Sequence, residues 1–174
     1  MVVAKEFLVD LDQIDMENII ADRDAIAIHN PQRFEMEQLS AVVYLDEESM
    51  TIVGYKDITE DEFWVRGHMP NMPLMPGVIQ LEAAAQLCSF ICQHLDVSGA
   101  DMVGFGGLDN VRFRESVIPG DRLIVICKLT RVRPRRMVVC DFQCIVNGEI
   151  ACEGTLRGIP LPIAALQAAV SRSK

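Results

Sequence analysis

One stretch of the chain decides its fold: Gly77-Val-Ile-Gln-Leu-Glu-Ala-Ala-Ala-Gln-Leu-Cys-Ser-Phe-Ile-Cys-Gln-His-Leu95. Most of these residues are apolar, and Pro76 stands where a helix can begin without losing a backbone hydrogen bond. We therefore predict a helix from Gly77 to about Leu95. Apart from Gln80, its polar residues follow at helical spacing and form one narrow stripe: Glu82, Gln86, Ser89 and Gln93. A helix that is apolar on its other sides is expected to be surrounded by protein.

Runs with the composition of β-strands lie on both sides of this helix. Upstream, residues 41–45 and 51–55 flank a polar turn, a pattern typical of a hairpin. Downstream, we interpret the glycines between residues 99 and 107 as a loop. The strands predicted after this loop are Arg122–Val132, Val138–Val146 and Ile150–Leu156.

The details of these runs favour an antiparallel sheet. Alternate residues between Val138 and Val146 are apolar, which predicts a half-buried strand. Asn147-Gly148, between the last two predicted strands, suits a two-residue type I′ turn. The sequence therefore predicts an α+β fold, in which an antiparallel sheet packs on one long buried helix.

Length and composition limit what the chain can be. Its 174 residues have a mass of 19.4 kDa, so we expect a single domain over 1–174, with 1–40 unassigned and 163–174 as a C-terminal extension. Hydrophobic residues make up 50% of the chain and charged residues 24%, which excludes a disordered or fibrous protein. The net charge of −9 argues against a nucleic-acid partner.

The sequence indicates neither a targeting segment nor a membrane span. Residues 1–12 lack the apolar core of a secretory signal, and a span over Met75–Leu95 would place Glu82 in hydrocarbon. The six cysteines form no Cys-x-x-Cys pair, and we interpret them as reduced, buried residues without a metal. These features predict a cytoplasmic protein.

Residues 66–77 have a different character from the runs around them. Pro70, Pro73 and Pro76 recur at every third position. Because proline fixes φ and biases its predecessor towards extended geometry, we predict a stiff, non-helical segment, which we call the strap. A surface Pro-x-x-Pro ligand is the alternative, but the strap is apolar and leads directly into the helix.

Two titratable residues flank the start of the helix. His68, with an ordinary pKa of about 6.5, can serve as a base, while burial of Glu82 would raise its pKa from about 4.3 and keep it protonated as an acid. Between them, the free N–H groups of Gly77 and Val78 favour an oxygen that gains negative charge. Together these groups suit α,β-elimination of water. The alternatives are a purely structural histidine and a carboxylate that is satisfied by Gln86 one turn on.

Two stretches of the chain resemble the active-site signature of the β-hydroxyacyl-(acyl carrier protein) dehydratases, which have the hot-dog fold. They are Gly67-His-Met-Pro-Asn-Met-Pro-Leu-Met-Pro-Gly-Val78 and Leu81-Glu-Ala-Ala-Ala-Gln86, and the step of fourteen residues from His68 to Glu82 matches as well. A further segment of the family resembles Leu108-Asp-Asn-Val-Arg-Phe-Arg114 and Val117-Ile-Pro-Gly-Asp121, so the resemblance covers about 41–158. Met69 and Asn71 depart from it, because the family usually has phenylalanine and glycine there.

The resemblance implies a curved antiparallel sheet wrapped around one long central helix, and a homodimer, with a trimer of dimers left open. The implied reaction converts (3R)-3-hydroxyacyl thioesters of acyl carrier protein into trans-2-enoyl thioesters in fatty-acid or lipid biosynthesis, without a metal or organic cofactor. His68 of one chain would be the base and Glu82 of the other the acid. Gly77, with Val78 beside it, would bind the thioester carbonyl, and Gln86 would help to place Glu82.

Other functions stay open at this point. A sister branch that also isomerises the double bond has aspartate where Glu82 stands, so straight dehydration is preferred. The chain could serve polyketide or other specialised lipid synthesis, or it could be a non-catalytic acyl-binding hot-dog protein, which would not need both His68 and Glu82.

A cluster of basic residues bears on the partner. The carrier protein of this family is acidic, and residues 128–136, the basic turn, hold five of the sixteen basic residues and no acidic one. We expect this turn, or Arg112 and Arg114, to steer the acidic carrier. The alternative is a turn that is simply solvated.

Overall fold

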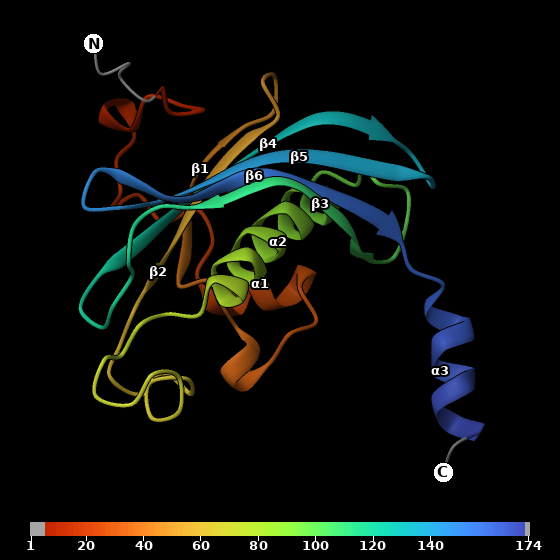
Figure 1. Cartoon of the computed structure of the whole chain (residues 1–174). Helices are drawn as coiled ribbons and strands as arrows, with labels where there is room; N and C mark the ends of the chain where they lie inside the picture. Colours follow the sequence, from red (N-terminus) through yellow and green to blue (C-terminus); the bar gives the residue numbers. More distant parts are fainter. Residues whose placement is uncertain (1–5, 173–174) are drawn as a thin grey trace.

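The structure, a computed structural model, describes residues 6–172; residues 1–5 of the unassigned segment and 173–174 of the extension lie outside the described residues. Figure 1 shows a curved sheet that wraps around one long helix. In chain order the elements, with η for a short 3-10 helix, are η1 (Leu11–Gln13), α1 (Arg23–His29), η2 (Phe34–Met36), β1 (Ala41–Asp46), β2 (Thr51–Asp57), α2 (Gly77–His94), β3 (Val103–Phe113), β4 (Arg122–Arg133), β5 (Met137–Val146), β6 (Glu149–Pro160) and α3 (Ile163–Arg172).

The sheet has six strands in the order β1-β2-β4-β5-β6-β3, and every neighbouring pair is antiparallel. The predicted hairpin is the β1–β2 pair, and the three later predicted strands are β4, β5 and β6. At the β5–β6 turn, Asn147 and Gly148 have φ of +51° and +78°, as a type I′ turn requires. The α+β prediction is confirmed.

The long helix α2 matches its prediction closely, since it begins at Gly77 and ends at His94, one residue before the predicted end. Phe90 and Ile91 are at most 1% exposed, since the sheet wraps around the helix and the Phe90 ring also packs against His29 of α1. The helix is therefore the centre of the core, as its apolar composition indicates.

The predicted glycine-rich loop is present up to residue 102 but is wrong for Gly104, Gly106 and Gly107, because residues 103–113 form the edge strand β3. Glycine is disfavoured in strands, so local composition argued for a loop. Pairing with β6 overrides this preference, and side chains near β6 use the space that the glycines leave. A Cβ atom on Gly104 would lie 2.6 Å from the Cγ of Leu161, and one on Gly106 would lie 2.7 Å from Ile159.

The second face of the sheet is also covered near its centre, so β5 alternates in burial only up to Phe142, as predicted, and is buried on both faces from Phe142 to Val146. Residues 7–16 of the N-terminal segment pack on this face, against Ile126, Ile145 and Ile150. Gln143 of β5 is only 7% exposed, because it accepts a hydrogen bond from the N–H of Leu8 (2.8 Å) and donates one to the Glu6 carbonyl (3.2 Å). A distant segment thus satisfies a polar side chain that looks solvated in the sequence.

Residues 66–76 of the strap contain neither helix nor strand, as predicted, but the extended geometry expected before each proline is absent at Met69, which precedes Pro70. Met69 and Asn71 both have positive φ, +55° and +67°. Asparagine tolerates this left-handed conformation better than other residues with side chains, so Asn71 can occupy a position where the resembling family usually has glycine. The departures from the family pattern therefore coincide with the sharpest bend after His68.

The two ends of the chain behave differently. The N-terminal segment includes α1, which Asp22 caps by accepting a hydrogen bond from the N–H of Ala25. At the other end, α3 extends away from the sheet (Figure 1). Within residues 6–172, no helix is both long enough and apolar enough to cross a membrane.

Candidate active site

His68 is held in a defined orientation by the strap. Its backbone N–H donates to the carbonyl of Trp64 (2.7 Å), and Trp64 is buried. Its Nδ1 atom lies 2.7 Å from the carbonyl oxygen of Leu74. Because a carbonyl can only accept, Nδ1 carries the proton, and Nε2 of the neutral ring keeps a free lone pair. That is the form that a general base requires.

The pocket around His68 contains the start of α2. This open pocket has a volume of about 520 Å³ and is also lined by Gly77, Val78 and Phe113. The N–H groups of Ile79 and Gln80 donate to the Pro76 carbonyl, at 2.9 and 3.3 Å. Those of Gly77 and Val78 have no partner within the described part of the chain, so they can bind an oxygen atom from a ligand.

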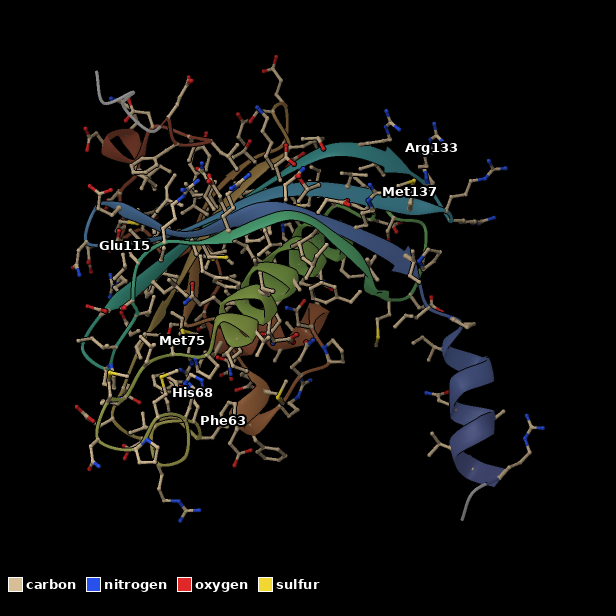
Figure 2. All side chains as sticks on the ribbon, viewed as in Figure 1. Phe63, His68, Met75, Glu115, Arg133 and Met137 are labelled. Carbon is tan, nitrogen blue, oxygen red and sulfur yellow. The ribbon has the colours of Figure 1, made fainter. Side chains whose placement is uncertain are left out.

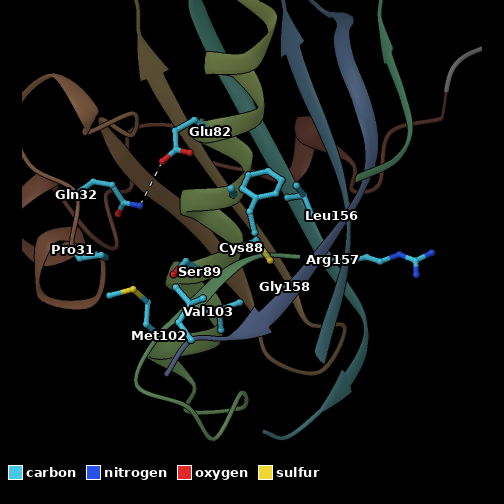
Figure 3. A pocket seen from close by; sticks show the side chains of 14 residues that line it. Pro31, Gln32, Glu82, Cys88, Ser89, Met102, Val103, Leu156, Arg157 and Gly158 are labelled. Atoms are coloured by element: carbon cyan, nitrogen blue, oxygen red, sulfur yellow. Dashed lines mark hydrogen bonds between the residues drawn. The ribbon is translucent and has the colours of Figure 1, made fainter. Parts of the chain in front are cut away.

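Glu82 is positioned by Gln86, one helical turn further on. The Glu82 carboxylate accepts a hydrogen bond from Gln86 Nε2 (2.8 Å) and a longer one from Gln32 Nε2 (3.5 Å). Figure 3 shows the contact with Gln32. Gln86 is 2% exposed; its Nε2 also donates to the Met36 carbonyl (2.6 Å), and its Oε1 accepts from the Gln38 N–H (2.8 Å). The predicted contact between Glu82 and Gln86 is present, although this contact alone also fits a purely structural carboxylate.

The structure corrects the expectation that Glu82 is fully buried, because the side chain is only partly buried within one chain. The reason is that its side of α2 faces a pocket of about 210 Å³ rather than the packed core. The lining of this pocket, which we call the Glu82 pocket, is largely apolar and includes Ala85, Cys88, Met102, Val103 and Leu161 (Figure 3).

His68 and Glu82 line different pockets of the chain. The fold thus brings Gly77 and Val78 to His68, and Gln86 to Glu82, but it does not place the two predicted catalytic side chains in one pocket. Separate half-sites are what a site shared by two chains would require.

Sequence reasoning missed the contribution of the loop after α1. Gln32 contacts Glu82, and Asn30 Nδ2 donates to the backbone carbonyl of Gln86 (2.9 Å). Arg33 fixes the loop by donating to the carbonyls of Ala27 and Asn30. The sequence carries one weak sign of this loop. Its residues Pro31-Gln-Arg-Phe-Glu-Met36 are faintly similar to a Pro-His-Arg-Tyr-Pro-Phe segment of the β-hydroxyacyl-(acyl carrier protein) dehydratases.

The cysteines contribute a core rather than a metal site. All six thiols are free and buried. Burial raises the pKa of Cys152 to about 12, and it also raises the pKa of Cys127 and Cys144. Among residues 6–172, no group of three or more His, Cys, Asp or Glu side chains is arranged to hold a metal ion.

Comparison with known proteins agrees with this geometry. The family model described as a FabA-like domain matches residues 30–155, so the chain belongs to the FabA-like family. FabZ of Streptococcus gordonii, a 3-hydroxyacyl-[acyl-carrier-protein] dehydratase, is 33% identical to it over 135 residues, which cover 78% of this chain and 94% of the relative. The resemblance to the β-hydroxyacyl-(acyl carrier protein) dehydratases is thereby confirmed.

Solved structures share the fold at low sequence identity. A chain of the dehydratase heterocomplex ApeI:P from Xenorhabdus doucetiae has a TM-score of 0.66 at 14% identity, covering 83% of this chain and 96% of that one. Cj0977, a sigma28-regulated virulence protein of Campylobacter jejuni, has a TM-score of 0.58 at 11% identity, covering 82% and 93%. Together with the family match, these likenesses confirm the predicted hot-dog fold.

Proposed function

We propose that this protein dehydrates (3R)-3-hydroxyacyl thioesters of acyl carrier protein to trans-2-enoyl thioesters in fatty-acid or lipid biosynthesis. The observation that carries the proposal is the contact between His68 Nδ1 and the Leu74 carbonyl, which leaves Nε2 free to accept a proton beside two unpartnered N–H groups. The 3-hydroxyacyl-[acyl-carrier-protein] dehydratase at 33% identity supports the same substrate class.

In the proposed reaction, His68 Nε2 removes a proton from C2 while the N–H groups of Gly77 and Val78 stabilise negative charge on the thioester oxygen. The electron pair of the C2–H bond forms the C2=C3 double bond, and the C3–O bond breaks. Glu82, in its protonated form, gives its proton to the departing hydroxyl, which leaves as water. Proton return from imidazolium to carboxylate restores both groups.

The reaction requires both side chains at one substrate, so we propose that the active unit is a homodimer with His68 and Glu82 from different chains. The separate pockets of these residues support this assignment. The edge strand β3 supports it too, because it leaves Phe105, Leu108 and Phe113 exposed, at 48%, 39% and 51%. A trimer of dimers is compatible with the same pairing.

We propose that the basic turn recognises the acidic carrier. Figure 2 shows Arg133 at the end of the sheet opposite to Glu115. Arg133, Arg135 and Arg136 are exposed, and none of them forms an ion pair with any residue between 6 and 172. Arg114, in contrast, is paired with Glu153, which makes it a weaker candidate.

The charge of the turn can be reversed to test this role. Arg133→Glu with Arg136→Glu should raise KM for a carrier-bound substrate and leave KM for a short thioester mimic unchanged. Arg23→Glu is the control for each of the two single reversals, because it makes the same charge change as either one at an exposed position in the first turn of α1. An equal rise in KM for both substrates would contradict the assignment.

All six cysteines are free and buried, which suits a reducing compartment. We therefore propose the cytoplasm as the location.

Turnover is tested by incubating the protein with a 3-hydroxyacyl thioester and following enoyl absorbance, for the wild type, His68→Ala and Glu82→Gln. We expect turnover by the wild type and a loss of at least about a hundredfold in each variant. Tight acyl binding without turnover would favour the non-catalytic acyl-binding protein instead. Turnover that both variants keep would show that the assigned roles are wrong.

A further inference from the structure

The C-terminal segment 161–162, between β6 and α3, lies against one end of the Glu82 pocket. Its side chain Leu161 lines the pocket together with Met102, Val103 and Gly104. The match to the FabA-like family model ends at residue 155, so this segment lies beyond the matched region. We propose that Leu161 is a gate through which the thioester arm of the carrier-bound substrate reaches Glu82. The inference rests on the proposed function.

Leu161 is held in place by contacts on both sides. Its N–H donates to the Met102 carbonyl (3.0 Å), which extends the pairing of Val103 with Pro160 by one more bond. Its side chain lies against the bare backbone of Gly104, where a Cβ atom would be only 2.6 Å from Leu161 Cγ. Pro160 and Pro162 restrict φ on either side of it. The glycine thus provides the space that the gate side chain occupies.

The basic turn lies beside the same end of the pocket. A second, smaller pocket is lined by Arg133 and Arg136 of the turn, and it shares Val103 and Gly158 with the Glu82 pocket. A carrier bound at the turn would therefore present its arm next to Leu161. At the Glu82 end, Gln32 forms part of the lining, and a further small pocket that shares Gln32 contains the single arginine Arg23 rather than a cluster.

The Glu82 pocket runs along α2 from Glu82 to Ser89, as a passage between the acid and Leu161 would. Glu82, Ala85 and Ser89 line it from one side of α2, and seven helical residues span about 10 Å. Figure 3 shows Glu82 at one end and Ser89, Met102 and Val103 at the other. A substituent at Leu161 would thus block the passage about 10 Å from the acid without touching it.

A reversible block tests the gate. Because all six native cysteines are buried, Leu161→Cys provides one accessible thiol, which a methanethiosulfonate reagent can modify and a reductant can restore. We expect modification to lower kcat/KM at least about tenfold for carrier-bound and mimic substrates alike, and reduction to restore it within about twofold. Recovery on reduction excludes a folding defect as the cause.

The matched control is Ile159→Cys, two residues earlier, near the end of β6. Ile159 is 43% exposed, and its side chain packs at Gly106 rather than lining the Glu82 pocket. Because Ile159 also lines the small pocket beside Arg133 and Arg136, the comparison uses the short thioester mimic, for which modification of Ile159→Cys should leave kcat/KM unchanged, as should treatment of the wild type. Equal effects at both positions would overturn the gate. So would a modified Leu161→Cys that keeps full activity on short substrates and loses only long acyl chains, because Leu161 would then close the acyl end.

The gate and the proposed function fail in different ways. If the wild type turns over no thioester, the dehydratase assignment is wrong, and the gate is tested by the association rate of a fluorescent acyl-pantetheine amide. A slower association after modification of Leu161→Cys, but not of Ile159→Cys, would still support the gate. An unchanged rate would overturn it.

Discussion

At the scale of single residues, Gln86 links the acid of the site to the N-terminal loop. It donates to Glu82 and to the Met36 carbonyl, and it accepts from the Gln38 N–H. Each of its polar atoms is used, so no rotation of this side chain can leave Glu82 in place and satisfy the loop as well. These contacts support a positioning role for Gln86, rather than a catalytic one, in the proposed reaction.

Replacing Gln86 by alanine should separate positioning from binding. Glu82 would keep only the 3.5 Å contact with Gln32, and we expect kcat to fall by about 10- to 100-fold with little change in KM. The buried partners left unpaired should also lower the free energy of unfolding by about 1–3 kcal/mol. Steady-state kinetics and urea denaturation measure the two effects.

Gln93→Ala is the matched control for this variant. Gln93 belongs to the same polar stripe of α2, but its side chain donates to the Ala100 carbonyl (3.2 Å) rather than to Glu82. Its replacement should leave kcat unchanged. A higher KM with an unchanged kcat in Gln86→Ala would show that Gln86 does not position the acid.

At the scale of elements, the contrast between α2 and β3 shows what the sequence could predict. The bounds of α2 follow from a local signal, an apolar run that starts after Pro76, so the prediction missed its end by one residue. The nature of β3 depends on Ile159 and Leu161, more than fifty residues later, whose side chains occupy the space at its glycines. A short stretch of sequence around Gly104 does not include these two residues, so it cannot predict the strand.

The candidate site divides in the same way. His68, Gly77 and Glu82 lie close together in the sequence and carry a recognisable spacing, so they could be identified before the structure. Gln32 could not, because the loop after α1 reaches Glu82 only through tertiary packing. The proposed sharing of the site by two chains could not be supported before the structure either, since its support is the separate pockets of His68 and Glu82.

The start of α2 gives a prediction at this scale, because a side chain on Gly77 would collide with the ring of Phe113. A Cβ atom on Gly77 would lie 2.6 Å from Cε1 of Phe113. Gly77→Ala should therefore displace the Phe113 ring over the two free N–H groups and lower kcat/KM by about tenfold or more. Adding Phe113→Ala removes the clash and should recover most of this loss, which a double-mutant cycle measures.

Additive losses in that cycle would contradict the steric explanation. The single variant Phe113→Ala is the control, and because Phe113 is 51% exposed, it should cost little stability.

At the scale of the whole molecule, the core is unusually rich in thiols that are kept neutral. Burial raises the pKa of Cys127, Cys144 and Cys152, and only the thiolate is reactive. We expect almost no reaction of the native protein with a thiol reagent near pH 8, and reaction of all six cysteines after denaturation.

The same shifts determine how stability depends on pH. Below about 8.5, thiols are neutral in both the folded and the unfolded chain, so stability is unaffected. Above it, the unfolded chain ionises while the folded core stays neutral, and the free energy of unfolding should fall as pH rises towards the raised pKa values. Denaturation at pH values around 7.5 and 9.5 measures this fall. Rapid labelling of the native protein near pH 8 would contradict the burial of the thiols.

The proposed sharing of the site between two chains predicts the activity of mixed dimers. If His68 and Glu82 act in different subunits, a mixed dimer of His68→Ala and Glu82→Gln contains one site with both residues intact and one with both replaced. Co-expression of the two inactive variants, with random assortment of chains, should therefore restore roughly a quarter of the wild-type activity. Mixed dimers isolated through two affinity tags should reach roughly half. If both residues act within one chain, neither preparation gains activity, and the measured turnover of the mixed dimer decides between the two arrangements.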